Sequence, residues 1–443
     1  MPAKATIFAL ATAAGRAPIA VVRVSGPAAG DAIRHLTGRE PPKPRTAGLR
    51  RLADGAERLD DGLVLWFPGP RSETGEDMAE FHLHGGRAVV GAVLAALAKT
   101  PGLTPAGPGA FTRQAFDNGK LDLTAAEAIA DLVEAETAAQ RRQALRQMDG
   151  ALARLYEDWR ERLLALLAHM EAAIDFPDED LPPELITKSD QTSAGLQSEI
   201  ESHLRDRRGQ QLRDGFSIAI LGAPNTGKST LLNVLAKRDV AIVSTRAGTT
   251  RDVVEAHLDI AGYPVILADT AGLRESADEI EAEGVRRARE RAGRAGLKLI
   301  LLDGASWPTV DTASAALVDA ESLILISKAD LNPAIPSRPL IDGRAALAVS
   351  VKSGAGVEDL LQALEAEVTQ RMSLAEAPAL TRARHREALA ECVAGLARSR
   401  TAPSPELKAE DLRLAARALG RITGRVDVEG ILDKVFAEFC IGK

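Results

Sequence analysis

The chain has 443 residues, of which 45% are apolar and 26% are charged, and its net charge is −7 at pH 7. This composition is typical of a globular protein, and the length predicts roughly three domains. The acidic balance argues against a protein that mainly coats nucleic acid, and the sequence holds no apolar run of ~18 residues that would span a membrane.

Residues 1–118 combine strand and helix patterns. Residues 6–25 predict two strands joined by a turn at 15–18, and the runs GLVLWF and AEFHLHGG predict further strands. The run RAVVGAVLAALAK predicts a helix, so we expect an α+β domain. A signal peptide is the alternative for the apolar start, but Arg16 and Arg23 interrupt that segment.

The pattern becomes helical after Gly119. Thr124 and Glu127 have the spacing of a capping box, and residues 151–174 carry an apolar stripe at helical spacing. A third helix is expected to end near QQLRDG. Helical sequence returns after Arg371 and continues to the end of the chain.

Between these helical stretches the pattern alternates strand, turn and helix. FSIAILG, VILADT, LKLILLD, SLILIS and AALAVS are nearly continuous apolar runs, as in buried parallel strands. Val357, Leu360 and Leu364 predict the apolar face of a closing helix. We therefore expect a helical domain interrupted by an inserted α/β domain. The expected domains are residues 1–118, the two helical parts 119–213 and 372–443, and the inserted domain 214–371.

The stretch GAPNTGKST follows a predicted strand and precedes a predicted helix, which is the context of a phosphate-binding loop. Backbone N–H groups opened by Gly222 and Gly227 are expected to cradle the phosphates. Lys228 would reach the β- and γ-phosphate oxygens, and the Ser229 hydroxyl would bind Mg²⁺.

Two later stretches continue this pattern. AGTTRD offers Thr250 as a second ligand of Mg²⁺. DTAGLR ends a strand, so that Asp269 would hold the metal through water and the Gly272 N–H would face the γ-phosphate.

The stretches SKAD and SVKSGAG predict the site of the base. The two acceptor oxygens of Asp330 match the N1–H and N2–H₂ donors of guanine, whereas adenine offers no such pair. The sequence therefore predicts GTP and not ATP. This motif usually begins with Asn; because Ser327 forms fewer hydrogen bonds, we expect weaker bracing of the loop and weaker nucleotide binding.

The predicted GTP-binding residues all lie in these loops. They are Asn225, Thr226, Gly227, Lys228, Ser229, Thr230, Ser244, Thr245, Arg246, Ala247, Gly248, Thr249, Thr250, Asp269, Thr270, Ala271, Gly272, Ser327, Lys328, Ala329, Asp330, Ser350, Val351 and Lys352.

The residue that positions the attacking water is not obvious. Ras-like GTPases use a Gln shortly after Asp-x-x-Gly, but Leu273 follows Gly272 here, and a hydrophobic side chain cannot position water. The acidic run at residues 275–284 is either the source of the base or an ordinary solvated loop.

Several specific stretches occur together: TGEDMAEFHLHGG, NGKLDLTAAEAIADL, EAAIDFPDED, the phosphate loop, GTTRD, DTAGLRE and the terminal FCIGK. Over nearly its full length the chain resembles the tRNA modification GTPase family MnmE, also called TrmE. The resemblance implies an N-terminal α+β domain that binds a tetrahydrofolate and dimerises, and an all-α helical domain interrupted by a Ras-like P-loop G domain.

The resemblance also implies an activity. A cytoplasmic homodimer would hydrolyse GTP in a potassium-dependent way as its two G domains associate. Together with the flavoprotein MnmG, in a heterotetramer, it would add a carboxymethylaminomethyl-type group to C5 of the wobble uridine of certain tRNAs. The one-carbon unit would come from 5,10-methylenetetrahydrofolate, of which 5-formyltetrahydrofolate is an analogue.

Site residues follow from the same resemblance. Asn225 matches the family's K⁺ ligand, together with backbone oxygens of Ser244, Arg246 and Thr249. Glu281 matches the acidic residue that acts on the attacking water through a second water.

The folate positions of the family correspond to Arg23, Glu80, Lys120 and Lys443. A pterin offers N–H donors to a carboxylate, and the glutamate tail of folate favours cations. The family's Gly-Arg-Gly-Gly turn appears here as GRAP at residues 15–18, where Ala and Pro restrict the backbone.

The two cysteines, Cys392 and Cys440, are far apart, which favours a reducing cytoplasm over a disulfide framework. Cys440 is a candidate for the modification chemistry; a prenyl anchor is disfavoured because Gly442 is not aliphatic. The apolar face of VEGILDKVFAEF, which includes Leu432 and Phe436, predicts a docked chain end.

Some alternatives stay open at this point. The basic run at residues 381–386 is either a tRNA or partner contact or a solvated helix face. A ribosome-assembly GTPase of the Era or Der kind would lack a use for residues 1–118, and a stand-alone folate enzyme would not explain the GTP loops.

Overall fold

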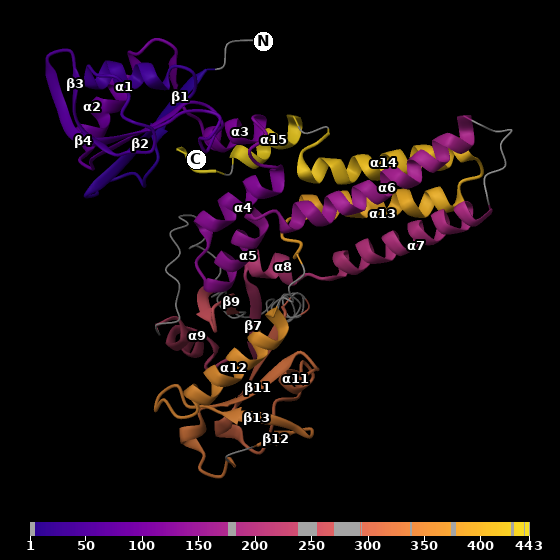
Figure 1. The fold of residues 1–443 in the computed structure, drawn as a ribbon. Helices are drawn as coiled ribbons and strands as arrows, with labels where there is room; N and C mark the ends of the chain where they lie inside the picture. Colours follow the sequence, from indigo (N-terminus) through magenta and orange to yellow (C-terminus); the bar gives the residue numbers. More distant parts are fainter. Residues whose placement is uncertain are drawn as a thin grey trace, which may run out of the picture. The chain divides into compact units, whose positions relative to one another are not determined.

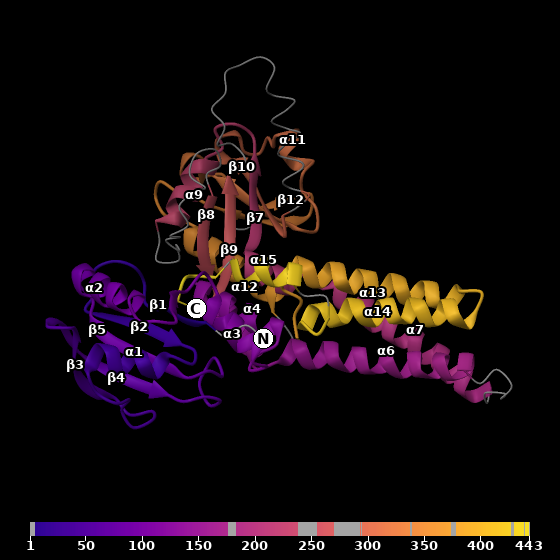
Figure 2. The same cartoon turned by 90° about the horizontal axis from the view of Figure 1, so that it is seen from above.

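The computed structural model divides into two compact units (Figures 1 and 2). Unit 1 comprises residues 1–130, 147–196 and 391–443, and unit 2 comprises residues 131–146 and 197–390. The described residues are 5–175, 183–237, 255–269, 293, 295–336, 339–373, 378–426, 429–437 and 439–442. None of the helices within these ranges is long and apolar enough to cross a membrane.

Unit 1 begins with a six-stranded sheet in the order β3-β4-β5-β2-β1-β6, antiparallel except for the β1–β6 pair. Helices α1 and α2 pack on one face of this sheet, where Val22, Val24 and Phe81 belong to a buried core. Arg23 and Glu80 alternate with these residues and lie on the opposite face. The predicted α+β fold is confirmed by β1 (Thr6–Leu10), β2 (Ile19–Ser25), α1 (Ala29–Thr37), β3 (Gly48–Asp54), β4 (Glu57–Phe67), β5 (Met78–His84), α2 (Arg87–Ala98) and β6 (Leu103–Pro105).

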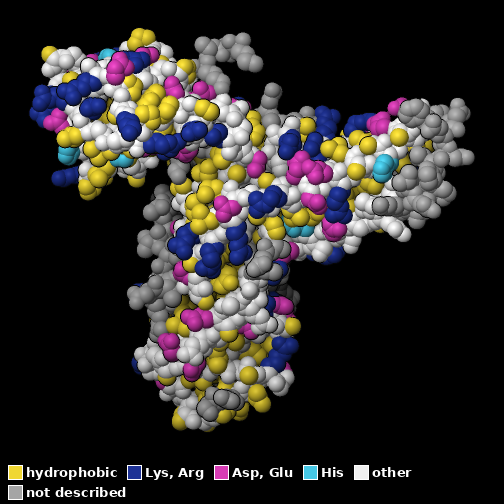
Figure 3. All heavy atoms as spheres, in the orientation of Figure 1, with side chains coloured by type: hydrophobic (Ala, Val, Ile, Leu, Met, Phe, Trp, Pro, Cys, Tyr) yellow, Lys and Arg dark blue, Asp and Glu magenta, His cyan; other side chains and the backbone are white. Residues whose placement is uncertain are grey.

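Two long helices of unit 1, α6 (Ala151–Asp175) and α14 (Pro405–Thr423), lie side by side (Figures 1 and 2). The predicted helix at 151–174 is thereby confirmed, with Leu152 and Leu163 buried. Basic and acidic side chains are interspersed over these helices in Figure 3, and Arg413 pairs with Glu171 at 2.5 Å. Other helices lying at least partly in unit 1 are α3 (Ala110–Asp117), α4 (Leu123–Glu134), α5 (Ala138–Met148), α7 (Pro183–Arg205), α13 (Ala383–Thr401) and α15 (Glu429–Ala437).

Two predictions about helices are wrong: one about how a helix starts and one about the continuity of the third helix, although that helical stretch does end near QQLRDG, at Asp214. The predicted capping box does not form: Asp122 accepts hydrogen bonds from the backbone N–H groups of Thr124 at 2.7 Å and Ala125 at 3.1 Å. The third predicted helix is two helices, α7 and α8 (Arg208–Asp214). Asp206 lies between them and accepts the backbone N–H of Arg208, the first residue of the second helix, at 2.9 Å.

Unit 2 is built on a seven-stranded sheet in the order β12-β13-β11-β10-β7-β9-β8. Its inner strands run parallel, and β12 and β8 are antiparallel edges. The predicted strands are confirmed as β7 (Phe216–Gly222), β9 (Tyr263–Asp269), β10 (Leu297–Asp303), β11 (Ser322–Ser327) and β13 (Arg344–Ala348). We did not predict β8 (Glu255–Ile260) or β12 (Leu340–Ile341), because neither carries the continuous apolar run of a buried strand.

Helices of unit 2 cover this sheet and connect its strands. Val357, Leu360 and Leu364 are buried in the core beside the sheet, which confirms the predicted face of the closing helix. The helical elements around the sheet are α9 (Lys228–Ala236), η1 (Gly304–Ser306), α11 (Thr312–Ala315), η2 (Ala329–Leu331) and α12 (Val357–Met372).

One carboxylate joins three segments of unit 2. Asp131, near the end of α4, accepts hydrogen bonds from Arg382 at 2.6 Å and from Arg213 at 3.1 Å. Arg213 lies in α8 just before β7, and Arg382 precedes α13. Arg382 and His385 are buried, so both interpretations of the basic run at 381–386 are wrong for these two residues.

We expect Asp131→Ala to lower the free energy of unfolding by about 3 kcal/mol, because it leaves a buried arginine without its carboxylate partner. Urea denaturation followed by circular dichroism measures the loss. Asp433→Ala is the matched control: Asp433 pairs with Arg113 at 2.8 Å, but their side chains are 76% and 44% exposed. The control should cost no more than about 1 kcal/mol. Equal losses in the two variants would contradict the importance of the Asp131 cluster.

Candidate functional site

The phosphate loop connects the end of β7 to the start of α9. Gly222 has a φ of +148°, and a Cβ at this position would lie 2.3 Å from the carbonyl oxygen of Leu301 on the neighbouring strand β10. Only glycine fits such a close approach. Asn225 and Gly227 also have positive φ, of +65° and +93°. The glycine spacing of the sequence motif therefore follows from the sharp turn between strand and helix.

Side chains of the phosphate loop form hydrogen bonds to its own backbone, and the N-terminus of α9 has no side-chain cap in the part of the chain that the structure describes. The Lys228 ammonium donates hydrogen bonds to the carbonyl oxygens of Gly222 at 2.9 Å and Ala223 at 2.8 Å, and Thr226 donates to Ala223 at 2.9 Å. No side chain among the described residues caps α9. A Cβ on Gly227 would meet no atom of the described part of the chain within 4 Å. A helix N-terminus with open space in front of it suits an anion such as a phosphate.

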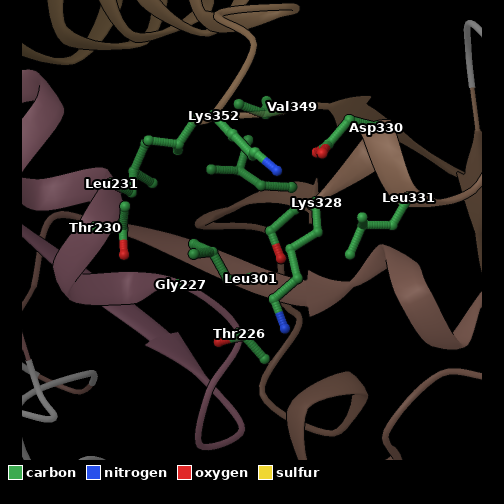
Figure 4. A pocket seen from close by; sticks show the side chains of 13 residues that line it. Thr226, Gly227, Thr230, Leu231, Leu301, Lys328, Asp330, Leu331, Val349 and Lys352 are labelled. Carbon is green, nitrogen blue, oxygen red and sulfur yellow. The ribbon is translucent and has the colours of Figure 1, made fainter.

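A cavity of about 280 Å³ lies between the phosphate loop and the loops that follow β11 and β13 (Figure 4). Part of its lining consists of residues predicted from the motifs: Thr226, Gly227, Thr230, Ser327, Lys328, Asp330, Val351 and Lys352. Sequence reasoning missed its apolar lining, which is Leu231, Leu301, Leu325, Leu331 and Val349. Most of these residues belong to apolar strands or helices, so their sequence pattern indicated burial and gave no sign of a ligand. An apolar cavity with a few polar groups is typical of a small-molecule site.

Asp330 is held with its carboxylate at this cavity. Ser350 donates a hydrogen bond to Asp330 Oδ1 at 2.6 Å. Ser350 was predicted as a site residue and does not line the cavity itself, but it holds a residue that does. Figure 4 shows the Asp330 carboxylate pointing into the cavity, with the side chain of Lys352 entering from a different loop. Ala329, also predicted, contributes a backbone N–H that donates to Val349 at 3.2 Å. The Ser350 hydroxyl therefore orients the carboxylate.

Several predicted site residues fall outside the part of the chain that the structure describes. They are Ser244, Thr245, Arg246, Ala247, Gly248, Thr249, Thr250, Thr270, Ala271, Gly272, Glu281 and Lys443. Asp269 ends β9 as expected from the sequence, and Ser229 lies in the first turn of α9.

In unit 1, Arg23 and Glu80 are register partners on β2 and β5. The guanidinium of Arg23 donates to one oxygen of Glu80 at 3.0 and 3.2 Å and pairs with Glu73 at 2.9 Å. It also lies 5.8 Å from the ring centroid of Phe111. The side chains of Arg23 and Glu80 are 17% and 16% exposed, so this ion pair is largely withdrawn from solvent. Sequence reasoning missed Glu73, which lies in an irregular loop.

Lys120 contacts the loop that carries Glu73, but it does not contact Arg23 or Glu80 through any hydrogen bond among the described residues. Its ammonium donates to the carbonyl oxygen of Pro70 at 3.0 Å. Asn118 supports the loop by donating to the carbonyl oxygen of Thr74 at 2.8 Å and to Glu76 at 2.9 Å. The loop at residues 69–77 thus contacts two of the predicted folate-binding residues.

The described end of the chain is docked on the first strand of unit 1. Ile441 forms a β-bridge with Pro108, and the Gly109 N–H donates to the backbone carbonyl oxygen of Cys440 at 3.5 Å. Gly442 has a φ of +98°, and a Cβ there would lie 2.2 Å from the carbonyl oxygen of Leu10. The predicted docking is confirmed.

The two cysteines differ in accessibility. Burial raises the pKa of the Cys392 thiol to about 12, which makes it a poor nucleophile. Cys440 is exposed.

The parallel sheet and the glycine-rich turn between β7 and α9 define a P-loop nucleotide-binding protein. Residues 123–440 match the family described as MnmE helical domain, and residues 6–120 match the family described as GTP-binding protein TrmE N-terminus. The chain belongs to the MnmE (TrmE) family of tRNA modification GTPases.

Individual relatives match over the full length. The tRNA modification GTPase MnmE of Paramagnetospirillum magneticum is 59% identical over 99% of this chain and 99% of its own. That of Rhodospirillum rubrum is 55% identical, again over 99% of each chain. Among solved structures, Aquifex aeolicus Era bound to GDP and AlF₄⁻ is 25% identical over 40% of this chain and 66% of that chain, with a TM-score of 0.27.

We expect Asp330→Asn to weaken GDP binding by about 100-fold or more, because an amide cannot accept both N–H donors of guanine. The same change should favour xanthosine diphosphate, whose second carbonyl accepts from the amide. Titration with fluorescent nucleotides measures both affinities. Asp342→Asn, at an exposed turn between β12 and β13, is the control. Unchanged selectivity in Asp330→Asn would remove this residue from base recognition.

Proposed function

We propose that the cavity of unit 2 binds GTP and that the bound nucleotide is hydrolysed. The observation that carries this proposal is the Asp330 carboxylate, oriented by Ser350 at 2.6 Å, across a cavity of about 280 Å³ from the phosphate loop. The predicted residues on the loops at 225–230, 244–250, 269–272, 327–330 and 350–352 would contact the nucleotide. The proposed G domain is residues 214–371, inserted between helical parts 119–213 and 372–443.

Two metal ions are part of the proposal for this site. The hydroxyl of Ser229 at the start of α9, with Thr250, would hold Mg²⁺ at the phosphates. Asn225, with backbone oxygens of Ser244, Arg246 and Thr249, would hold K⁺. The positive φ of Asn225 supports a loop conformation in which its amide can turn toward a ligand. A cation in this position supplies the charge that an arginine finger supplies in other GTPases.

Glu281 is the proposed residue that orients the attacking water. We expect Glu281→Ala to lower kcat for GTP hydrolysis by about 100-fold or more while GTP affinity changes little. Phosphate release measures turnover, and equilibrium titration measures binding. Glu275→Ala, in the same acidic run, is the control. Replacing K⁺ with Na⁺ should also slow the wild-type protein. Full turnover in Glu281→Ala, or equal rates in the two salts, would contradict the respective role.

Unit 1 is proposed to take a reduced folate, with residues 1–118 as the folate-binding and dimerisation domain. Glu80 would accept N–H groups of the pterin, and Arg23, Lys120 and Lys443 would supply the positive charge that anionic groups of folate require. The support is the Arg23–Glu80 ion pair, whose nitrogen and oxygen lie 3.0 Å apart and whose side chains are largely shielded from solvent. The proposed product, formed with MnmG, is a wobble uridine with a carboxymethylaminomethyl-type group on C5. Cys440 is a candidate for this chemistry.

Mass spectrometry of tRNA nucleosides tests the proposed product. A strain that lacks this gene should lose the modified uridine and regain it with the wild-type gene. We expect Arg23→Ala to restore little modification, because Glu80 and the folate then lose their cation. Arg51→Ala is the control, since Arg51 is an exposed arginine that faces Asp61 at 3.7 Å. An unchanged nucleoside profile in the deletion strain would refute the tRNA proposal.

A further inference from the structure

The base loop, defined here as residues 327–332, contains the carboxylate that would select guanine. It has little hydrophobic support: no residue of η2 is buried, and Leu331 is 59% exposed. Ser327, in the position where the family pattern has Asn, donates a hydrogen bond to the carbonyl oxygen of Leu302 at 3.1 Å. Polar contacts from elsewhere must therefore fix the position of Asp330.

Asp303 provides the first of these contacts. It ends β10 and is the register partner of Ser327 on β11. One carboxylate oxygen accepts the Ala305 N–H at 3.0 Å, and the other accepts from the Lys328 ammonium at 2.7 Å. Asp303 thus fixes its own turn and holds the second residue of the base loop at the same time.

Asn332 provides the second contact, at the other end of the base loop. Its amide group donates to the carbonyl oxygens of Trp307 at 3.1 Å and Gly304 at 3.3 Å, and its oxygen accepts the Ala334 N–H at 3.0 Å. Both acceptors of the amide belong to the turn at residues 303–307, the turn that Asp303 starts.

The turn itself is packed tightly against the end of β11. A Cβ on Gly304 would lie 2.3 Å from the carbonyl oxygen of Ser327. A tightly packed turn is therefore bonded to both ends of the base loop, through Lys328 and Asn332.

We propose that Asp303 and Asn332 are positioning residues for guanine recognition, which take over bracing that the Ser at position 327 does not provide. The turn at residues 303–307 is the support, and Asp330 is the group that it positions. This inference rests on the proposed GTP site. Its physical basis is that a carboxylate discriminates between bases only when its two oxygens are held in register with the two donors.

The test is nucleotide binding by Asp303→Asn and Asn332→Ala. Asp303→Asn keeps an oxygen for the Ala305 N–H but removes the charge that holds Lys328. We expect each variant to bind GDP about five- to tenfold more weakly, which corresponds to the loss of about one hydrogen bond that supports the loop. Inosine diphosphate lacks the 2-amino group, which in GDP would donate a hydrogen bond to Asp330. The preference for GDP over inosine diphosphate should therefore fall as well, and a general loss of stability would not change this ratio.

Rescue by a second substitution adds an independent readout. Ser327→Asn restores a side chain with more hydrogen-bonding groups at the start of the loop. It should improve GDP binding more in the Asn332→Ala background than in the wild-type chain. Such non-additivity indicates that the two positions serve the same support.

Asp311→Asn is the matched control, because Asp311 caps α11 through Ser314 at 2.7 Å in the same way but does not contact the base loop. GDP affinity and base preference equal to those of this control in both test variants would overturn the proposal. Asp330→Asn separates the two levels of inference. If Asp330→Asn leaves guanine preference intact, the proposed GTP site is wrong; if only the brace variants have no effect, the site stands and the positioning role is wrong.

Discussion

Parallel strand pairing in unit 2 is the constraint on which the nucleotide site depends. The carboxyl ends of β7, β10 and β11 meet at one edge of the sheet, with Gly222 opposite Leu301 and Asp303 opposite Ser327. Ligand sites of open parallel sheets form at such an edge because successive loops converge there. The phosphate loop, the turn at 303–307 and the base loop are thus neighbours only because their strands are paired. Each loop by itself would carry no site.

The two sides of this site are stabilised by different kinds of interaction. On the phosphate side the support is backbone geometry: close packing at Gly222 and positive φ at Asn225 and Gly227 leave a helix start facing open space. On the base side the support is a set of polar side chains on a loop with no buried residue in η2. Backbone geometry tolerates few substitutions, whereas side-chain bracing can be redistributed among several residues. This difference is consistent with a Ser at position 327, where the base motif usually has Asn.

Unit 1 applies a related principle in an antiparallel sheet. Register places Arg23 directly beside Glu80, and the loop at 69–77 adds Glu73 to the same guanidinium. The chain end then returns to the first strand, where Gly442 packs against Leu10. A terminus that would ordinarily fray is fixed by the apolar side chains of Leu432, Phe436 and Phe439 beneath it.

The sequence by itself determined most element types, because continuous apolar runs and helical stripes reflect burial directly; β8 and β12 lack such runs and were not predicted. It also determined the phosphate loop and Asp330, whose chemistry requires particular residue types at fixed spacing. Helix boundaries were less accessible. Asp122 caps α4, and Asp206 accepts an N–H at the break between α7 and α8, through local geometry that several neighbouring residues could equally have provided. Only the tertiary structure decided that Arg382 is buried beside Asp131, that His385 is buried, and that Asp303 and Asn332 meet at one turn. These contacts join residues that are distant in the chain. The type of a charged or amide side chain does not identify the residue that it will contact after folding.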